Sequence, residues 1–150
     1  MNKIFLQVLF INLILCSIFT FELQSKEKIR VHLIPHTHDD VGWVLSINEY
    51  FTQKVRSIIT TMVDMLYQDP SKKFVYAEMA FFKKWWDEQT PTRKNLVRQL
   101  IDNKQLEIIN AGWSMNDEAA PYYEDVIDNM AGGLEWAHNH LGVVPNIGWQ

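Results

Sequence analysis

The stretch KIRVHLIPHTHDDVGW, Lys28–Trp43, joins a short apolar run to a cluster of polar side chains. The run is rich in β-branched residues and ends at a proline, a pattern that predicts a buried strand over Lys28–Pro35. Two histidines and two aspartates follow at once, and a glycine and a tryptophan come next. Side chains of the kinds that bind metal ions therefore follow the first predicted strand directly.

The rest of the chain repeats this order of short apolar runs and longer periodic segments. Further strands are predicted at Lys73–Met79 and Leu106–Ala111, and Val144–Gln150 begins to look like a fourth. Between them, apolar residues at three- and four-residue spacing predict helices over residues 48–67, 81–89, from 90 onward, and 123–141. Thr90 and Pro91 look like a helix start, and Gly142 like a helix stop. This alternation predicts an α/β fold with parallel strands, in an open sheet or part of a barrel.

Composition limits the classes of function. The chain has 150 residues, is 47% hydrophobic and 13% aromatic, and carries a formal net charge of -4, which is typical of a globular protein. It contains no cluster of lysine and arginine, which argues against nucleic acid and against a basic membrane-surface module. A small neutral substrate fits this composition better.

The first residues predict a secretory signal. Met1-Asn2-Lys3 gives a positively charged start, and the segment that follows, as far as Phe21, is almost wholly apolar. We expect removal near residue 24, which would leave no stable membrane association, whereas an uncleaved anchor is the alternative. Cys16, the only cysteine, lies inside this segment, so the mature part has no cysteine nucleophile, cysteine zinc site or disulfide.

Polar groups follow each of the first three predicted strands. They are the histidines and aspartates of residues 36–40, Glu78, and the stretch GWSMNDEAAPYY that begins at Gly112. Sites form at the carboxyl ends of parallel strands, so these groups are predicted to share one pocket. The simplest interpretation of Glu78 is a hydrogen-bond acceptor at a strand end.

The first group has the composition of a metal site. Residues two apart on an extended segment point to the same side, so His36, His38 and Asp40 are predicted to face together. Imidazole nitrogen and carboxylate oxygen, without sulfur, suit zinc. The alternative is a hydrogen-bond network in which Asp39 or Asp40 caps the next helix.

Tryptophan has two interpretations in this chain. Trp43 follows the ligand-type residues, where it would either pack in the core or offer a flat face for stacking on a sugar. The remaining tryptophans of the predicted helices are expected to pack helix against sheet: Trp85, Trp86 and Trp136.

Three motifs, PHTHDDVGW, YAEMAFFKKWWDEQT and NAGWSMNDEAAPYY, occur in this order. Together they resemble the amino-terminal catalytic region of the α-mannosidases of glycoside hydrolase family 38, most closely the lysosomal type, from about Val31 to Gln150. The resemblance implies the first half of a (β/α) barrel-like glycosidase domain over residues 25–150. It also implies a zinc ion held by His38 and Asp40, with Trp43 lining the mannose subsite.

The same resemblance implies zinc-dependent, retaining hydrolysis of terminal α-linked mannose from glycans. In that family the nucleophilic aspartate is also a zinc ligand, and it is expected just after Gln150. We therefore expect this chain to hold half of a zinc site and to be inactive alone. A secreted or lysosomal location in the secretory pathway is expected.

Two other functions fit parts of the sequence. A metal hydrolase of the amidohydrolase type would use His36 and His38 as joint ligands. A secreted, non-catalytic relative would bind mannose-rich glycan through Trp43. The first alternative requires His36 at the metal, whereas the mannosidase interpretation requires Asp40.

Overall fold

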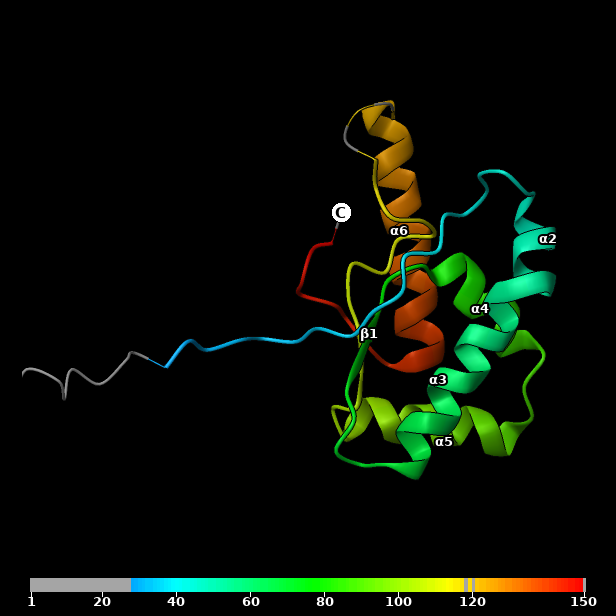
Figure 1. Ribbon diagram of the computed structural model, residues 1–150. Coiled ribbons are helices and arrows are strands. Elements are labelled where there is room, and N and C mark those ends of the chain that lie inside the picture. Colours follow the sequence, from blue (N-terminus) through cyan, green and yellow to red (C-terminus); the bar gives the residue numbers. More distant parts are fainter. Residues whose placement is uncertain (1–27, 118, 120, 150) are drawn as a thin grey trace, which may run out of the picture. The chain divides into compact units, whose positions relative to one another are not determined.

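A computed structural model of the chain describes residues 28–117, 119 and 121–149 (Figure 1). The predicted signal over residues 1–24 lies outside the described residues. The elements, in chain order, are α2 (Ile47–Tyr50), the π-helical η1 (Phe51–Val55), α3 (Arg56–Gln68), β1 (Phe74–Tyr76), α4 (Met79–Asp87), α5 (Pro91–Asp102), β2 (Leu106–Ile108) and α6 (Tyr123–Leu141). None of the described helices is long and apolar enough to cross a membrane.

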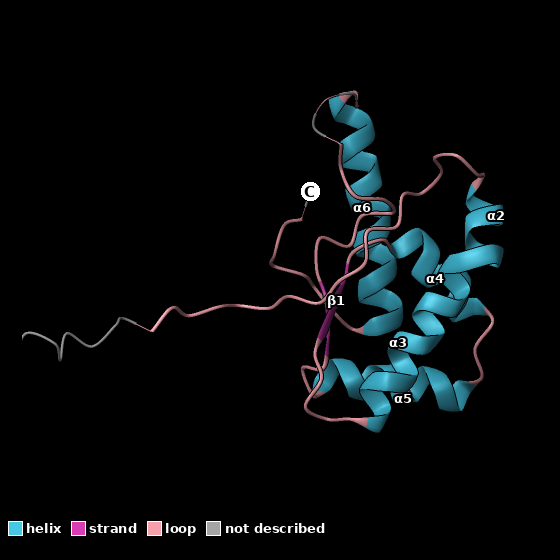
Figure 2. Cartoon of the chain, in the orientation of Figure 1, coloured by secondary structure: helices cyan, strands magenta, loops and turns pink. Residues whose placement is uncertain are grey.

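The two strands form a parallel pair, and Val75 of β1 lies opposite Glu107 of β2 (Figure 2). Leu106 and Ile108 are buried, whereas Glu107 between them is exposed, so β2 packs one face against the core. One residue separates the strand from Asn110 (φ 55°) and Ala111 (φ 61°), which adopt the left-handed conformation, so the extended backbone does not continue past Ile109. The mixed α/β class with parallel strands is confirmed.

The first and fourth predicted strands are wrong. No strand is assigned within Lys28–Pro35, although His36 forms an isolated parallel bridge with Val75 and the Val75 amide donates to the Pro35 carbonyl (3.0 Å). Its apolar side chains are exposed: Ile29, Val31, Leu33 and Ile34. Within residues 144–149 no strand forms, and the Asn110 amide donates to the Ile147 carbonyl (2.8 Å). An apolar run becomes a buried strand only when neighbouring segments pair with it and cover it, and the described part of the chain supplies too few of them.

The predicted helices form close to their predicted bounds. The helix expected over residues 48–67 is a continuous run of α2, η1 and α3. Ser46 caps it, because its hydroxyl accepts from the Glu49 amide while the Glu49 carboxylate accepts from the Ser46 amide. The prediction that Asp39 or Asp40 caps this helix is therefore wrong.

The predicted start of a helix at Thr90 and Pro91 and the predicted stop at Gly142 are confirmed, whereas the helix predicted over residues 81–89 runs over Met79–Asp87. The Thr90 hydroxyl accepts from the Arg93 amide at the start of α5, and Pro91 is the first helical residue. Gly142 ends α6 in the left-handed conformation (φ 73°).

The core is aromatic and joins the helices to the strands. Trp85, Trp86 and Trp136 are buried in it, as predicted. The Trp85 indole N–H donates to the Thr60 hydroxyl at 2.9 Å, so this buried donor has a partner on α3. The core therefore holds α3, α4 and α6 together and fixes the positions from which the strand-end loops leave.

Candidate functional site

His38 and Asp40 meet on the extended segment that precedes α2. His38 Nε2 lies 3.3 Å from Asp40 Oδ1, and the two side chains are 62% and 47% exposed. Gly42 follows with a φ of 92°, a conformation that suits glycine, and its amide donates to the Asp40 carbonyl at 2.9 Å. The turn leaves an imidazole nitrogen and a carboxylate oxygen side by side and open to solvent.

His36 does not join this pair. Its ring packs edge-on against Trp149, with 4.7 Å between ring centroids, and its Nδ1 lies 2.9 Å from the Thr37 carbonyl oxygen. Within the described residues no three His, Cys, Asp or Glu side chains are placed to hold one metal ion. The prediction that His36 faces the same way as His38 and Asp40 is therefore wrong, because a tryptophan distant in the sequence takes the imidazole ring.

Glu78 is fully buried at the carboxyl end of β1, and its Oε1 accepts a hydrogen bond from the Asp39 amide at 3.2 Å. The prediction of a strand-end acceptor is confirmed. Burial disfavours the charged carboxylate and raises the pKa of Glu78 to about 7. Burial also raises the pKa of Asp39, and it raises the pKa of the Tyr76 hydroxyl with the help of the nearby Glu78 carboxylate.

Several buried polar atoms at this end of the sheet lack a hydrogen-bond partner within the described part of the chain. They are Thr37 Oγ1, Asp39 Oδ2, Tyr76 Oη, Glu78 Oε2, Asn110 Nδ2 and Trp149 Nε1. Most buried polar groups in proteins have a hydrogen-bond partner, so a concentration of buried polar atoms without one is unusual at this end of the sheet.

The loop after β2 is tied to the start of α4. The amides of Met79 and Ala80 donate to the carbonyls of Gly112 and Trp113, both at 3.0 Å. The backbone following β1 and the backbone following β2 are therefore held together, as the prediction of converging strand ends requires.

Asn129 of α6 fixes the next part of the same loop. Its Oδ1 accepts from the Ser114 amide, and its Nδ2 donates to the Ser114 carbonyl, both at 2.9 Å. Asn129 is not among the site residues predicted from the sequence. Asn129 precedes the buried Gly133 by one helical turn and lies on the same face as Trp136, so a polar residue on a predicted apolar face was the available signal.

Glycines bring α6 very close to this loop. A Cβ atom at Gly133 would lie 2.1 Å from the Ala111 carbonyl oxygen, and one at Gly132 would lie 2.4 Å from the Trp113 indole nitrogen. Only residues without a side chain allow this approach. The loop that follows β2 therefore packs directly against the backbone of α6.

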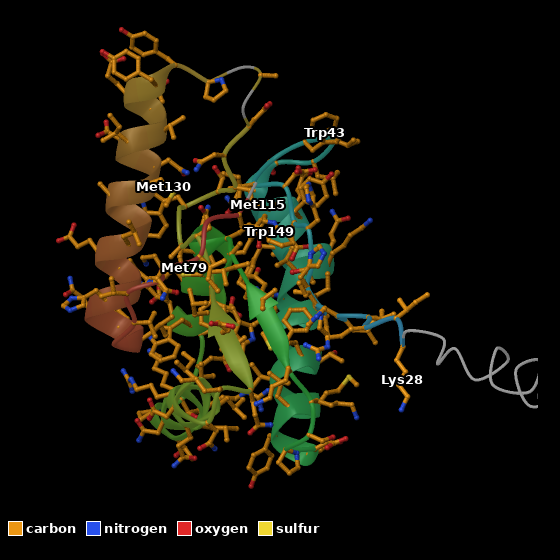
Figure 3. The ribbon with its side chains drawn as sticks, turned by 90° about the vertical axis from the view of Figure 1, so that its left-hand side faces the viewer. Lys28, Trp43, Met79, Met115, Met130 and Trp149 are labelled. Atoms are coloured by element: carbon orange, nitrogen blue, oxygen red, sulfur yellow. The ribbon has the colours of Figure 1, made fainter. Side chains whose placement is uncertain are left out.

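Trp43 lies on the surface. Its side chain is 78% exposed, and Figure 3 shows it apart from Met115 and Trp149. The core-packing interpretation is therefore wrong. Its flat face is available for stacking, and its contact with a sugar stays a prediction.

Solved structures of similar fold were found. An α-mannosidase from Enterococcus faecalis has a TM-score of 0.61 at 18% identity, and the match covers 75% of this chain and 12% of that chain. A 4-α-glucanotransferase from Thermococcus litoralis has a TM-score of 0.56 at 24% identity, over 76% of this chain and 18% of that chain. The chain therefore shares a mixed α/β fold with parts of these two proteins.

The family follows from the sequence. Residues 28–150 match the model of the N-terminal domain of glycosyl hydrolases family 38, and the chain belongs to this family. It is 44% identical over 131 residues to a probable α-mannosidase of Arabidopsis thaliana, covering 82% of this chain and 12% of that protein. It is 44% identical over 133 residues to a lysosomal α-mannosidase of Dictyostelium discoideum, covering 83% of this chain and 13% of that protein.

A third relative is α-mannosidase 2 of Homo sapiens, which is 42% identical over 123 residues, covering 82% of this chain and 11% of that protein. The relatives are thus of several types, and one of them is named lysosomal. The chain spans only 11 to 13% of the length of these three relatives.

Proposed function

We propose that this chain is the first part of the catalytic domain of a zinc-dependent, retaining α-mannosidase that removes terminal α-linked mannose from glycans. One observation supports it most directly: His38 Nε2 and Asp40 Oδ1 lie 3.3 Å apart and open to solvent, on a chain of glycosyl hydrolase family 38. His36 is turned toward Trp149, which favours the His38–Asp40 pair over the His36–His38 pair of an amidohydrolase-type site.

The donor set of the pair fits zinc, which binds imidazole nitrogen and carboxylate oxygen. Zinc sites are usually four-coordinate, so other residues of the protein would supply the remaining ligands and the catalytic carboxylates. When bound, the ion supplies Lewis-acid binding of sugar hydroxyl groups. Trp43 would stack on the mannose ring, a role that its exposed face permits.

The proposal extends to architecture and location. The strand pair and its flanking segments at His36 and Ile147 would form the first half of a (β/α) barrel-like domain. Residues 1–24 would be a removed secretory signal, and the enzyme would act in the lysosome or outside the cell. The likeness to a lysosomal α-mannosidase supports this location.

The test uses the protein expressed from its complete coding sequence. His38→Ala and Asp40→Ala are compared with His36→Ala as the matched control, and zinc content and hydrolysis of an aryl α-mannoside are measured. The proposal expects His38→Ala and Asp40→Ala to lose both, with His36→Ala retaining most of its zinc.

Equal loss of zinc in His36→Ala and His38→Ala, with Asp40→Ala unaffected, would favour the amidohydrolase alternative. A wild-type protein that binds mannose-rich glycan through Trp43 but hydrolyses no mannoside would point to the non-catalytic alternative. A glycan-binding assay with Trp43→Ala identifies that outcome.

A further inference from the structure

We propose that Glu78 is a positioning residue: by accepting a hydrogen bond from the Asp39 amide, it keeps the neighbouring side chains of His38 and Asp40 in place. The inference rests on the proposed function, in which His38 and Asp40 bind the metal. Glu78 touches neither side chain of that pair in a hydrogen bond. It acts on the peptide between them.

The hydrogen bond from the Asp39 amide to Glu78 Oε1 joins residues 39 positions apart. The other hydrogen bonds of the turn are local, such as those from the Gly42 amide to the Asp40 carbonyl and from the Trp43 amide to the Leu45 carbonyl. Within the described residues, Glu78 therefore makes the only hydrogen bond that ties the segment 37–43 to a distant part of the fold. His38 and Asp40 are the immediate neighbours of the tied peptide.

The Glu78 backbone is itself well fixed. Its carbonyl accepts from the Phe82 amide at 3.2 Å, and the next residue, Met79, donates to the Gly112 carbonyl at 3.0 Å. The flanking residues Ala77 and Met79 are buried. A carboxyl group carried on this backbone can transmit the rigidity of the core to a turn in which the side chains of His38 and Asp40 are exposed.

Simpler roles do not account for this carboxyl group. Glu78 is the N-cap residue of α4, but its side chain makes no capping hydrogen bond. A leucine of similar size would fill the same space without the cost of burying a carboxyl group. That cost is real here, because Oε2 of Glu78 has no hydrogen-bond partner in the described part of the chain. Because neither packing nor capping requires a carboxyl group here, the hydrogen bond to Asp39 is the contribution that is specific to glutamate.

The test again uses the protein expressed from its complete coding sequence. Glu78→Leu removes the acceptor, whereas Glu78→Gln keeps an acceptor oxygen of the same reach. The matched control is Gln105→Leu, because Gln105 is also a buried polar residue that ties distant backbone, donating to the Leu66 carbonyl at 2.7 Å away from the ligand pair. Zinc affinity is measured by competition with a chromophoric chelator, and exchange of the Asp39 amide by residue-resolved hydrogen exchange.

Glu78→Leu is expected to lower zinc affinity by about tenfold or more, the usual effect of losing a residue that orients a metal ligand, and Glu78→Gln by about threefold at most. Gln105→Leu is expected to lower stability without lowering zinc affinity. In the metal-free protein, the Asp39 amide is expected to be protected in the wild type and in Glu78→Gln but not in Glu78→Leu.

Unchanged zinc affinity in a folded Glu78→Leu protein would overturn the inference, as would an equal loss of affinity in Gln105→Leu. Should Glu78→Leu fail to fold, an Asp39 amide that exchanges in the wild type as fast as the His38 amide would overturn it. A wild-type protein that binds no zinc would instead refute the proposed function, and the exchange experiment would still decide whether Glu78 restrains the turn.

Discussion

Replacing Gly133 with alanine tests whether α6 seats the loop that follows β2. The added Cβ would lie 2.1 Å from the Ala111 carbonyl oxygen, 2.6 Å from the Gly112 carbonyl carbon and 2.7 Å from the Trp113 amide nitrogen. All of these atoms belong to the backbone. No rotation of a side chain can relieve the contact, so the helix and the loop must separate.

The magnitude follows from two opposing effects. Non-bonded heavy atoms approach favourably to about 3.5 Å, so the two backbones must move apart by more than about 1 Å. Overpacking of this kind costs about 3 kcal/mol at the upper end of its usual range. Alanine is favoured over glycine inside a helix by about 1 kcal/mol, which leaves a net loss of about 2 kcal/mol in the free energy of unfolding.

Urea denaturation followed by tryptophan fluorescence measures this loss, and the control is Gly148→Ala. Nothing lies within 4 Å of a Cβ at Gly148, so that variant is expected to change stability by about 0.5 kcal/mol at most. Gly132→Ala should give an intermediate loss, because its Cβ meets the Trp113 side chain, which can shift. A Gly133→Ala protein as stable as the wild type would refute the close seating of the loop on α6.

Three further predictions concern the candidate site. The pKa of Glu78 is raised from 4.5 to about 7 in the folded state, so its stabilising contribution is complete below pH 4.5 and is lost by about pH 7, a difference of about 3 kcal/mol. Urea denaturation of the metal-free wild type should show the free energy of unfolding falling as the pH rises across that range. The same profile should be flatter in Glu78→Gln, and parallel profiles for the two proteins would contradict the raised pKa of Glu78. Asn129→Ala leaves the Ser114 amide and carbonyl without their partner, so the free energy of unfolding is expected to fall by about 1–3 kcal/mol. Residues 113–116 are also expected to become more accessible to proteolysis, and unchanged cleavage would argue that Asn129 does not restrain this loop. Trp43→Ala removes an exposed side chain and is expected to change the free energy of unfolding by about 0.5 kcal/mol at most, so a larger loss in thermal unfolding would show that Trp43 packs against the fold.

Sequence reasoning succeeded where the signal is local. The three- and four-residue spacing of Ile59, Met62, Val63 and Leu66 describes the buried face of α3, and these residues are indeed buried. Gly142 adopts the left-handed conformation that a helix stop requires. Such features depend on residues within a few positions of each other, which the sequence displays directly.

The outer strands were not predictable in the same way. The run over Lys28–Pro35 has the composition of a buried strand, but composition does not reveal whether a neighbouring segment pairs with it. Leu106–Ile108 has a partner in β1 and forms a strand, whereas Lys28–Pro35 lacks a ladder and stays exposed. Strand formation depends on distant residues, and a single sequence does not locate them.

The same limit applies to the candidate site. The two-residue alternation correctly brought His38 and Asp40 together, but it also included His36, whose ring instead packs on Trp149. The hydrogen bond between Asp39 and Glu78 depends on how β1 lies beside residues 36–40. Neither contact has a local signature, because each joins segments that only the fold brings together.

The exposed apolar run before His36 has a consequence for how the protein is made. Domains are synthesised from the amino terminus, so this run leaves the ribosome before α3, α4 and α6 can assemble their shared core. An extended segment with unpaired edges and the exposed side chains of Ile29, Val31 and Leu33 is the type that sticks to other chains. We expect chaperones to bind this run while the chain is being synthesised.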